Sequence, residues 1–349
     1  MNNWHLRFAV TSACNFKCKY CHSHGKLEKG IPDDEIKEIL KAAYENNIQR
    51  VHWTGGEPLV KKNILELMHY AKDLGYQEQS ITTNGQLLGP LARPLVDAGV
   101  SRFNISLDTL DPDLFGEVTT VYCLDQVLQG LDAVMTQTDK TVKINMVVMK
   151  DNLHEVGRFI KLADGYNTRF GQERILIRFL QFFPCQPNQL STEGQTYWKQ
   201  EYVTEKEILM EIAKEGAVER TLNCPFAGDN PTMRYYKIMG KNVSFGLLAM
   251  FSWGYVCGDC HKLRITPQGM TSVCLNDNEM FKIQGLPYEE KKALIAKMID
   301  RRNVLIAAHP ERKHYRKNLG EVRFGKTMQG MELEEFYKIA AEQQLTAAS

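Results

Sequence analysis

The segment HLRFAVTSACNFKCKYC (residues 5–21) joins a short β-strand pattern to three closely spaced cysteines. Cys14, Cys18 and Cys21 lie in the predicted loop at the carboxyl end of the strand, where barrels and open parallel sheets place their active sites. Three thiolates on one loop can each bind one iron of a [4Fe-4S] cube and leave the fourth iron without a protein ligand. The segment therefore predicts a parallel α/β protein whose iron–sulfur site is open to a small molecule.

Two other interpretations of these cysteines remain open on the residues alone. His22 or His24 could complete a zinc site, or the thiols could be buried and inert. Zinc sites favour paired C-x2-C halves, whereas here a three-residue gap precedes a two-residue gap. The spacing therefore favours a cluster over zinc.

The composition indicates a globular protein of one large or two ordinary domains, with 349 residues and 43% hydrophobic content. Forty-three basic and forty-two acidic side chains create no overall field for nucleic acid or an anionic membrane. The N-terminus lacks a long apolar region, and the most apolar later stretch, residues 244–256, is too short to span a bilayer. We therefore expect a cytoplasmic protein in which close-spaced members of the nine cysteines ligate metal or act in redox chemistry.

Strand-like and helix-like segments alternate through the first half of the chain, which predicts a parallel sheet, open or curled into a barrel. The predicted strands are residues 5–10, 50–54, 79–83, 102–107, 142–148 and 174–182. The predicted helices are residues 33–46, 63–75, 124–137 and 153–164.

Alternation within these strands separates an apolar face from a polar one. Phe8 opposes Arg7 in the first strand, and Trp53 opposes His52 in the second. An ordinary closed barrel fills its interior with branched apolar side chains. The polar face therefore predicts an open partial barrel around a polar ligand, and the alternative is a sheet with one solvated face.

After about residue 183 the rhythm breaks into a Pro-, Gln- and Ser-rich stretch, followed by a helical pattern. We predict an α/β fold in which residues 1–220 form a partial (β/α)6 TIM-like barrel. Residues 221–349 would form an α+β extension that carries a second cluster.

A second cysteine group has the spacing C-x2-C-x13-C at Cys257, Cys260 and Cys274. Three thiols again suit a [4Fe-4S] cube with one open iron. A structural zinc site would need a fourth ligand, which His261 or Cys224 could supply. The residues alone leave cluster and zinc as equal alternatives at this group.

Four motifs in one order resemble the radical S-adenosylmethionine (SAM) superfamily. They are C-x3-C-x2-C after the first strand, TGGEP (54–58), TTNG (82–85) and NISLD (104–108). The resemblance implies that a reduced cluster cleaves SAM to a 5′-deoxyadenosyl radical, which takes a hydrogen atom from the substrate. It assigns cofactor binding to Tyr20, Gly55, Gly56, Glu57, Asn84 and Ser106. Independently, the two glycines let the backbone approach a ligand closely.

The carboxyl-terminal half is similar to the MoaA family, the GTP 3′,8-cyclases of molybdenum-cofactor biosynthesis. The similarity rests on the second cysteine group, on RITPQG (264–269) and on IRFLQFFP (177–184) with Cys185 after it. It implies a second [4Fe-4S] cluster that binds the purine of a nucleotide and basic residues that hold its phosphates. Arg7, Lys143, Lys262 and Arg264 are the catalytic candidates, and His52 and Thr82 join them as substrate-binding candidates.

Several positions depart from that family. His52 stands where an Arg is typical, and Lys262 replaces another Arg, which removes planar bidentate contacts to phosphate. Phe183 stands where Met is usual, and the tail EQQLTAAS lacks a terminal Gly-Gly. Each lost charge-assisted hydrogen bond costs about 1.5–3 kcal/mol. We therefore expect a paralogue that uses two-cluster chemistry on a nucleotide-like molecule, forming or rearranging a carbon–carbon bond in a lyase-type reaction.

Alternatives remain open: an authentic GTP 3′,8-cyclase, a peptide-modifying radical SAM enzyme and a non-enzymatic iron–sulfur scaffold or sensor. We expect no N-terminal peptide-recognition domain, because the first cysteine is residue 14. A reductant such as flavodoxin or ferredoxin and a homodimer are the expected partners. Burial is expected for Cys123, Cys185 and Cys224, although the last two could face the cavity or supply a fourth ligand.

Overall fold

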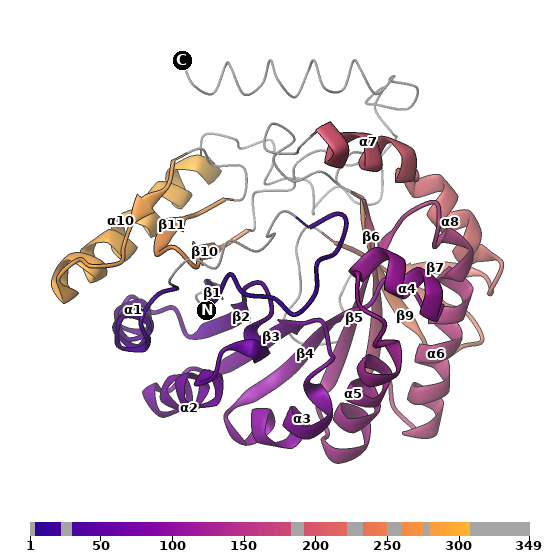
Figure 1. The fold of residues 1–349 in the computed structure, drawn as a ribbon, viewed down its shortest axis with the longest axis horizontal. Coiled ribbons are helices and arrows are strands. Elements are labelled where there is room, and N and C mark those ends of the chain that lie inside the picture. Colours follow the sequence, from indigo (N-terminus) through magenta and orange to yellow (C-terminus); the bar gives the residue numbers. More distant parts are fainter. Residues whose placement is uncertain are drawn as a thin grey trace.

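The computed structural model describes residues 4–21, 30–182, 192–221, 233–249, 260–274 and 279–307. In this part of the chain a single open sheet of twelve strands runs in the order β12-β11-β10-β1-β2-β3-β4-β5-β6-β9-β8-β7 (Figure 1). Its centre is six parallel strands in chain order, which confirms the predicted partial barrel. They are β1 (His5–Ala9), β2 (Arg50–Thr54), β3 (Glu78–Thr83), β4 (Val100–Ser106), β5 (Thr141–Val148) and β6 (Ile175–Gln181).

Helices cover the outer face of the curved sheet (Figure 1). Their apolar stripes pack on one strand face, where Phe8 and Trp53 are fully buried and stacked with ring centroids 6.4 Å apart. No helix among the described residues is both long and apolar enough to cross a membrane. The helices over the parallel strands are α1 (Asp33–Glu45), α2 (Ile64–Leu74), α3 (Leu88–Asp97), α4 (Pro112–Thr119), α5 (Leu124–Gln137) and α6 (Val156–Arg169).

The carboxyl-terminal half extends this sheet at both edges. The strand β10 (Lys262–Ile265) pairs in parallel with β1, and β11 (Met270–Ser272) and β12 (Phe281–Lys282) follow outward. At the opposite edge β9 (Ser244–Leu248) pairs in parallel with β6, followed by β8 (Arg234–Ile238) and β7 (Val218–Thr221). The division into residues 1–220 and 221–349 stays a prediction, and both segments contribute strands to one sheet.

The polar strand face lies in the interior of the partial barrel. Ser80, Asn104 and Lys143 on this face are each 1% exposed. Neighbouring strands are in register, so that Arg264, Arg7 and His52 form one row across β10, β1 and β2. Because these polar side chains are buried, the alternative of a solvated sheet face is wrong.

Among the described α-helices that were not expected from the pattern, three precede residue 202. Pro90 and Pro94 lie within α3, where missing backbone donors argue against a helix, although the buried Leu88, Ala92 and Leu95 hold it on the sheet. The N-terminus of α4 has an available signal, because Asp111 caps it and proline follows. The third helix, α7 (Thr192–Glu201), begins inside the stretch interpreted as irregular.

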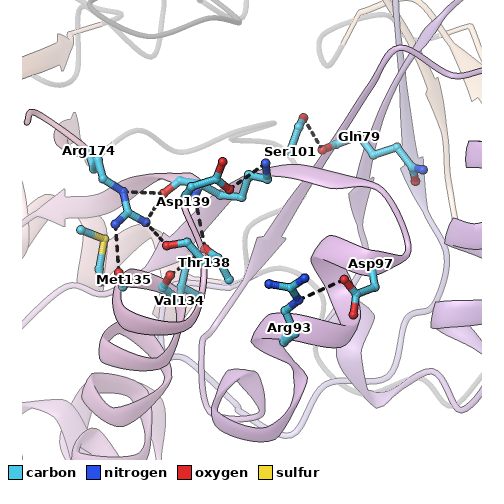
Figure 2. A network of polar contacts seen from close by, with 10 residues as sticks. Gln79, Arg93, Asp97, Ser101, Val134, Met135, Thr138, Asp139 and Arg174 are labelled. Carbon is cyan, nitrogen blue, oxygen red and sulfur yellow. Dashed lines mark hydrogen bonds and ion pairs between the residues drawn. The ribbon is translucent and has the colours of Figure 1, made fainter.

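A buried arginine closes the end of α5. Arg174, 4% exposed, donates hydrogen bonds to the carbonyls of Met135 (2.9 Å), Thr138 (2.7 Å) and Lys140 (2.9 Å) (Figure 2). The last carbonyls of a helix lack intrahelical partners, so a cation there satisfies both hydrogen bonding and the helix dipole. Arg174 therefore fixes the start of β6 against the end of α5.

Candidate functional site

The first cysteine loop is held by the end of α4. The backbone N–H groups of Lys17 and Lys19 donate to the carbonyls of Thr119 (3.1 Å) and Val118 (2.9 Å). Phe16 is buried below the loop, with 6% exposure. These backbone bonds hold the loop over the carboxyl end of the strands.

The thiols on this loop are placed differently with respect to solvent: Cys14 is exposed, whereas Cys18 and Cys21 are half-buried. Burial raises the pKa of Cys14 and of Cys18, and the carboxylate of Asp108 and the neighbouring thiols raise the pKa of Cys18 further. A raised pKa means that the thiolate form is unfavourable in this environment. Metal binding stabilises the thiolate and releases its proton. The loop therefore suits metal binding.

Gly55 and Gly56 are required by the cysteine loop itself. A Cβ on Gly55 would lie 2.5 Å from the carbonyl oxygen of Thr11, and one on Gly56 would lie 2.3 Å from that of Ala13. At this close approach Gly56 N–H donates to Thr11 O (2.8 Å) and Glu57 N–H donates to Ala13 O (2.9 Å). These two glycines therefore allow a close approach of backbone to backbone, and their part in cofactor binding stays a prediction.

Glu57 connects the GGEP turn to the TTNG turn. Its carboxylate, 1% exposed, accepts hydrogen bonds from the N–H groups of Leu59 (3.0 Å) and Asn84 (2.6 Å) and from Thr83 Oγ1 (2.8 Å). Burial raises the pKa of Glu57 to about 7, and the three hydrogen bonds act in the opposite direction. Asn84 Nδ2 in turn donates to Asn15 Oδ1 on the cysteine loop (2.7 Å). The three predicted turns therefore form one connected unit.

Tyr20 is tied to the NISLD motif. Its hydroxyl donates to Asp108 Oδ2 (2.5 Å), and Asp108 Oδ1 accepts from the N–H of Val147 (2.8 Å). Burial raises the pKa of Asp108 to about 6 despite these two hydrogen bonds. Ser106 lies two residues before Asp108, at the carboxyl end of β4 on the interior face.

Basic side chains concentrate in the barrel interior. The pKa of Lys262 is lowered to about 8, chiefly by burial and further by the nearby charges of Arg7, Arg264 and Arg178, whereas Cys260 acts to raise it. Arg178, which comes from β6, also donates to Asn104 Oδ1 (2.6 Å). Cations from strands on both sides of the interior therefore act on one another.

His52 lies within this cationic interior but is bonded to the barrel wall. Its Nδ1 and Nε2 each lie 2.7 Å from a hydroxyl oxygen, those of Ser80 and Thr82 respectively. Burial, followed by the charge of Arg7 and other cations, lowers the pKa of His52 well below its usual value. The imidazole is consequently neutral near pH 7, and Thr82, also a predicted substrate contact, is bonded to it.

The second cysteine group lies at the other end of the strands. Cys260 directly precedes β10 and Cys274 follows β11, and both are half-buried. His5 N–H, at the start of β1, donates to the carbonyl of His261 (2.9 Å). A five-residue strand is roughly 15 Å long, so the barrel interior separates this group from the loop after β1. Cys257 lies outside the described residues.

Comparison with known proteins identifies the family. The Radical SAM superfamily model matches residues 8–163, and the Molybdenum Cofactor Synthesis C model matches residues 179–309. The GTP 3′,8-cyclase of Geobacter sulfurreducens is 33% identical over 88% of this chain and 90% of its own length. The GTP 3′,8-cyclase of Lactiplantibacillus plantarum is 32% identical over 85% and 87%. The chain belongs to the radical SAM superfamily. It is a radical SAM enzyme that resembles the GTP 3′,8-cyclases.

Solved radical SAM structures share its fold. Streptococcus suis SuiB superimposes with a TM-score of 0.56 at 18% identity, covering 79% of this chain. The chain spans 61% of the length of SuiB. The enzyme anSMEcpe with bound AdoMet superimposes with a TM-score of 0.55 at 16% identity and 98% coverage of each chain.

Membership in the radical SAM superfamily implies SAM and one [4Fe-4S] cluster. In the described ranges no three His, Cys, Asp or Glu side chains are arranged to hold a single metal ion. A cube distributes its thiolates over separate irons, so three cysteines on one loop fit it. Cys123 is buried, as expected, whereas Cys185, Cys224 and Phe183 lie outside the described residues, as do His22 and His24.

Three further polar residues near the candidate site were not among the predicted site residues. Arg178 and Asn145 lie on the interior face of β6 and β5, in register with each other. Strand alternation places Asn145 on the polar face, and the same reasoning applied to β6 could have found Arg178. Asn145 Oδ1 is buried and accepts no hydrogen bond from the described residues. Asp108 closes the NISLD motif, but only the fold shows that it binds Tyr20.

Proposed function

We propose that this radical SAM enzyme acts on an anionic nucleotide held in the barrel interior, between the two cysteine groups. The observation that carries the proposal is the excess of positive charge on the buried polar face. An anion of several charges would be stabilised there, because several nearby cations attract it.

The charge balance of the strands supports this substrate class. Strands β1–β6 and β10 contain a single carboxylate, that of Glu78. It forms ion pairs with Arg102 (2.6 Å) and Arg50 (3.8 Å). The same strands carry five further basic residues, Arg7, Lys143, Arg178, Lys262 and Arg264.

The residues at the carboxyl end of the strands would hold SAM and its cluster. When bound and reduced, the cluster supplies the electron that cleaves SAM to a 5′-deoxyadenosyl radical, which takes a hydrogen atom from the substrate. Cys14, Cys18 and Cys21 would hold the irons, and the turns containing Gly55–Glu57 and Asn84 would support the SAM-binding surface. Ser106 and Tyr20 would contact its adenosyl part.

A hydrogen-bond acceptor on the interior face supports ribose binding. Asn145 Oδ1 is buried without a donor among the described residues, at the height of Ser106 on the neighbouring strand. A buried acceptor is costly unless a donor reaches it. We propose that a ribose hydroxyl of SAM or of the nucleotide supplies that donor.

The second cysteine group would hold a second [4Fe-4S] cluster, completed by Cys257, and its open iron would bind the nucleotide base. Arg7, Lys143, Lys262 and Arg264 would bind the phosphates and act as the catalytic cations. The reaction would form or rearrange a carbon–carbon bond, as in a lyase or cyclase.

Two substrate assignments are distinguished by His52. Its ring nitrogens are bonded to Ser80 and Thr82, so it adds no cation to a phosphate site. This favours a paralogue whose nucleotide carries fewer charges than a triphosphate. Authentic GTP 3′,8-cyclase activity is the second candidate, favoured by the names of the relatives.

Anaerobic turnover tests the proposal. The reduced protein is mixed with SAM and with GTP, GDP, GMP or guanosine, and 5′-deoxyadenosine and nucleotide products are measured. We expect nucleotide-stimulated SAM cleavage with at least one of the charged nucleotides. Equal cleavage with guanosine and with no nucleotide, together with no nucleotide binding, would overturn it. A cyclised product from GTP would identify a cyclase.

We also propose a small protein reductant, such as flavodoxin or ferredoxin, as the electron donor. A cytoplasmic location and a homodimer complete the proposal. Light scattering of the holoprotein measures the oligomeric state directly.

A further inference from the structure

The helix α10 (Tyr288–Ala307) has an unusual buried stripe. Ile295 and Met298 are fully buried, as the apolar face of a helix should be. The same stripe continues four residues in each direction to Lys291 and Arg302, which are 1% and 3% exposed. A buried cation is costly unless it is paired or hydrogen-bonded. Each end of this stripe must therefore meet a partner.

Lys291 joins α10 to the barrel. Its Nζ lies 2.9 Å from Glu35 Oε2 and 2.5 Å from Glu38 Oε2, and both carboxylates belong to α1. Figure 1 shows α10 beside α1 at the outside of the sheet. The backbone adds a contact, because Asn46 Nδ2 donates to the carbonyl of Lys292 (3.1 Å).

Arg302 joins the other end of α10 to the second cysteine group. Its Nε–H donates to the carbonyl oxygen of Cys260 (2.8 Å), directly before β10. The carbonyl of Cys274 accepts from Ser272 Oγ, at 3.3 Å, within the same hairpin. A guanidinium has a planar and permanently charged donor set, so its hydrogen bond to a buried carbonyl is directional and strong.

We propose that α10 is a strut between the barrel and the second cysteine group, and that Arg302 is the positioning residue that fixes Cys260. The part of this inference that concerns a cluster rests on the proposed function above. The part that concerns the protein backbone does not, since the hydrogen bond and the ion pairs exist without metal.

Hydrogen exchange of the full-length protein, read by mass spectrometry, tests the strut. In Arg302→Met we expect the amides of residues 260–265 to exchange about tenfold faster, since a charge-assisted hydrogen bond holds that segment. Arg301→Met is the matched control, because Arg301 is adjacent on α10 and pairs with the exposed Glu279 (2.7 Å). Unchanged exchange in Arg302→Met would overturn the inference.

Iron content tests the positioning of Cys260. We expect Arg302→Met to fall from about eight irons per chain to about four, while SAM still perturbs the remaining cluster signal. Arg301→Met should keep its iron. Full iron in Arg302→Met would refute the positioning role. If the wild type itself holds only four irons per chain, the second cluster is refuted. Hydrogen exchange is then the remaining test of α10 as a strut.

Two conservative variants separate charge from hydrogen bonding. Arg302→Gln keeps a donor without the charge, and we expect it to retain iron but to shift the second reduction potential to more negative values. Arg302→Lys keeps the charge but loses the planar donor set. We expect its reduction potential to lie close to that of the wild type, whereas its iron content should recover less completely. A potential equal to that of the wild type in Arg302→Gln would show that the charge plays no part.

Discussion

The two cysteine groups differ in how the chain assembles them. Cys14, Cys18 and Cys21 occupy eight consecutive residues, fixed by backbone contacts to the turn after β2 and to the end of α4. Cys260 and Cys274 flank a hairpin whose position depends on β1 and, as we propose, on α10. The cysteines of the first group therefore lie on one short loop, although distant parts of the chain hold that loop, whereas the second group is assembled across a hairpin.

Removing one cysteine from each group gives the largest expected effects. Cys14→Ala should lower 5′-deoxyadenosine formation by about a thousandfold or more, because that cluster supplies the electron. Cys260→Ala should retain SAM cleavage and lose the nucleotide product. Anaerobic quantification of 5′-deoxyadenosine and of the nucleotide product in each variant checks these two expectations. Equal loss of 5′-deoxyadenosine in both variants would contradict the separate roles proposed for the two cysteine groups. Cys123→Ala serves as the control.

Charge in the interior between the groups should have the next largest effect. Arg264→Gln should weaken binding of an anionic nucleotide about 10- to 150-fold, the equivalent of about 1.5–3 kcal/mol for a charge-assisted hydrogen bond. Calorimetry with the anaerobic protein measures the affinity. Arg93→Gln is the control, since Arg93 pairs with Asp97 at 3.1 Å on the exposed side of α3 (Figure 2). Equal affinities in the two variants would contradict the proposed phosphate site.

Breaking the contact of α10 with α1 should have a smaller effect than the changes above, and this effect should be on the stability of the fold. Lys291→Met leaves the half-buried carboxylate of Glu35 and the more exposed one of Glu38 without their cation and should cost about 2 kcal/mol. Lys292→Met removes the exposed pair with Glu45 (2.7 Å) and should cost less than Lys291→Met, because solvent screens an exposed pair. Chemical denaturation of the two variants measures the difference. If they are equally stable, the buried ion pair does not anchor the helix.

The smallest expected effect concerns acid sensitivity. The pKa of His52 is lower in the folded protein than in the unfolded chain, so the unfolded chain binds more protons below about pH 6.5. Stability from this group is present above that pH and is lost as the pH falls, by about 1 kcal/mol near pH 5.5. His52→Gln should therefore flatten the fall in melting temperature on acidification. His69→Gln, on the exposed side of α2, should leave it unchanged, and parallel curves for all three proteins would contradict the assignment.

Local periodicity in the sequence was sufficient to predict the central strands. Residues 50–54 were predicted with their observed bounds, because apolar and polar side chains alternate there without interruption. The helix over residues 124–137 was predicted equally well. Residues 88–97 were not, because two prolines and a glycine oppose a helix that tertiary packing nevertheless stabilises.

The site was predictable where its residues belong to recognisable motifs at the ends of successive strands. The motif order brought together the cysteine loop and the GGEP and TTNG turns, which Glu57 and Asn84 now connect. The sequence could not indicate that β10 would pair with β1, because pairing between distant strands leaves no local pattern. The roles of Arg178 and Arg302 depend on that pairing and on α10, and so they emerged only in three dimensions.

The pairing of β1 with β10 also bears on synthesis of the chain. His5 meets Lys262 in the finished sheet, more than 250 residues later. At about 5–20 residues per second, one edge of β1 waits roughly 10–50 seconds for its neighbour to leave the ribosome. A strand edge that stays unpaired for this time can pair with the wrong strand and can be bound by chaperones.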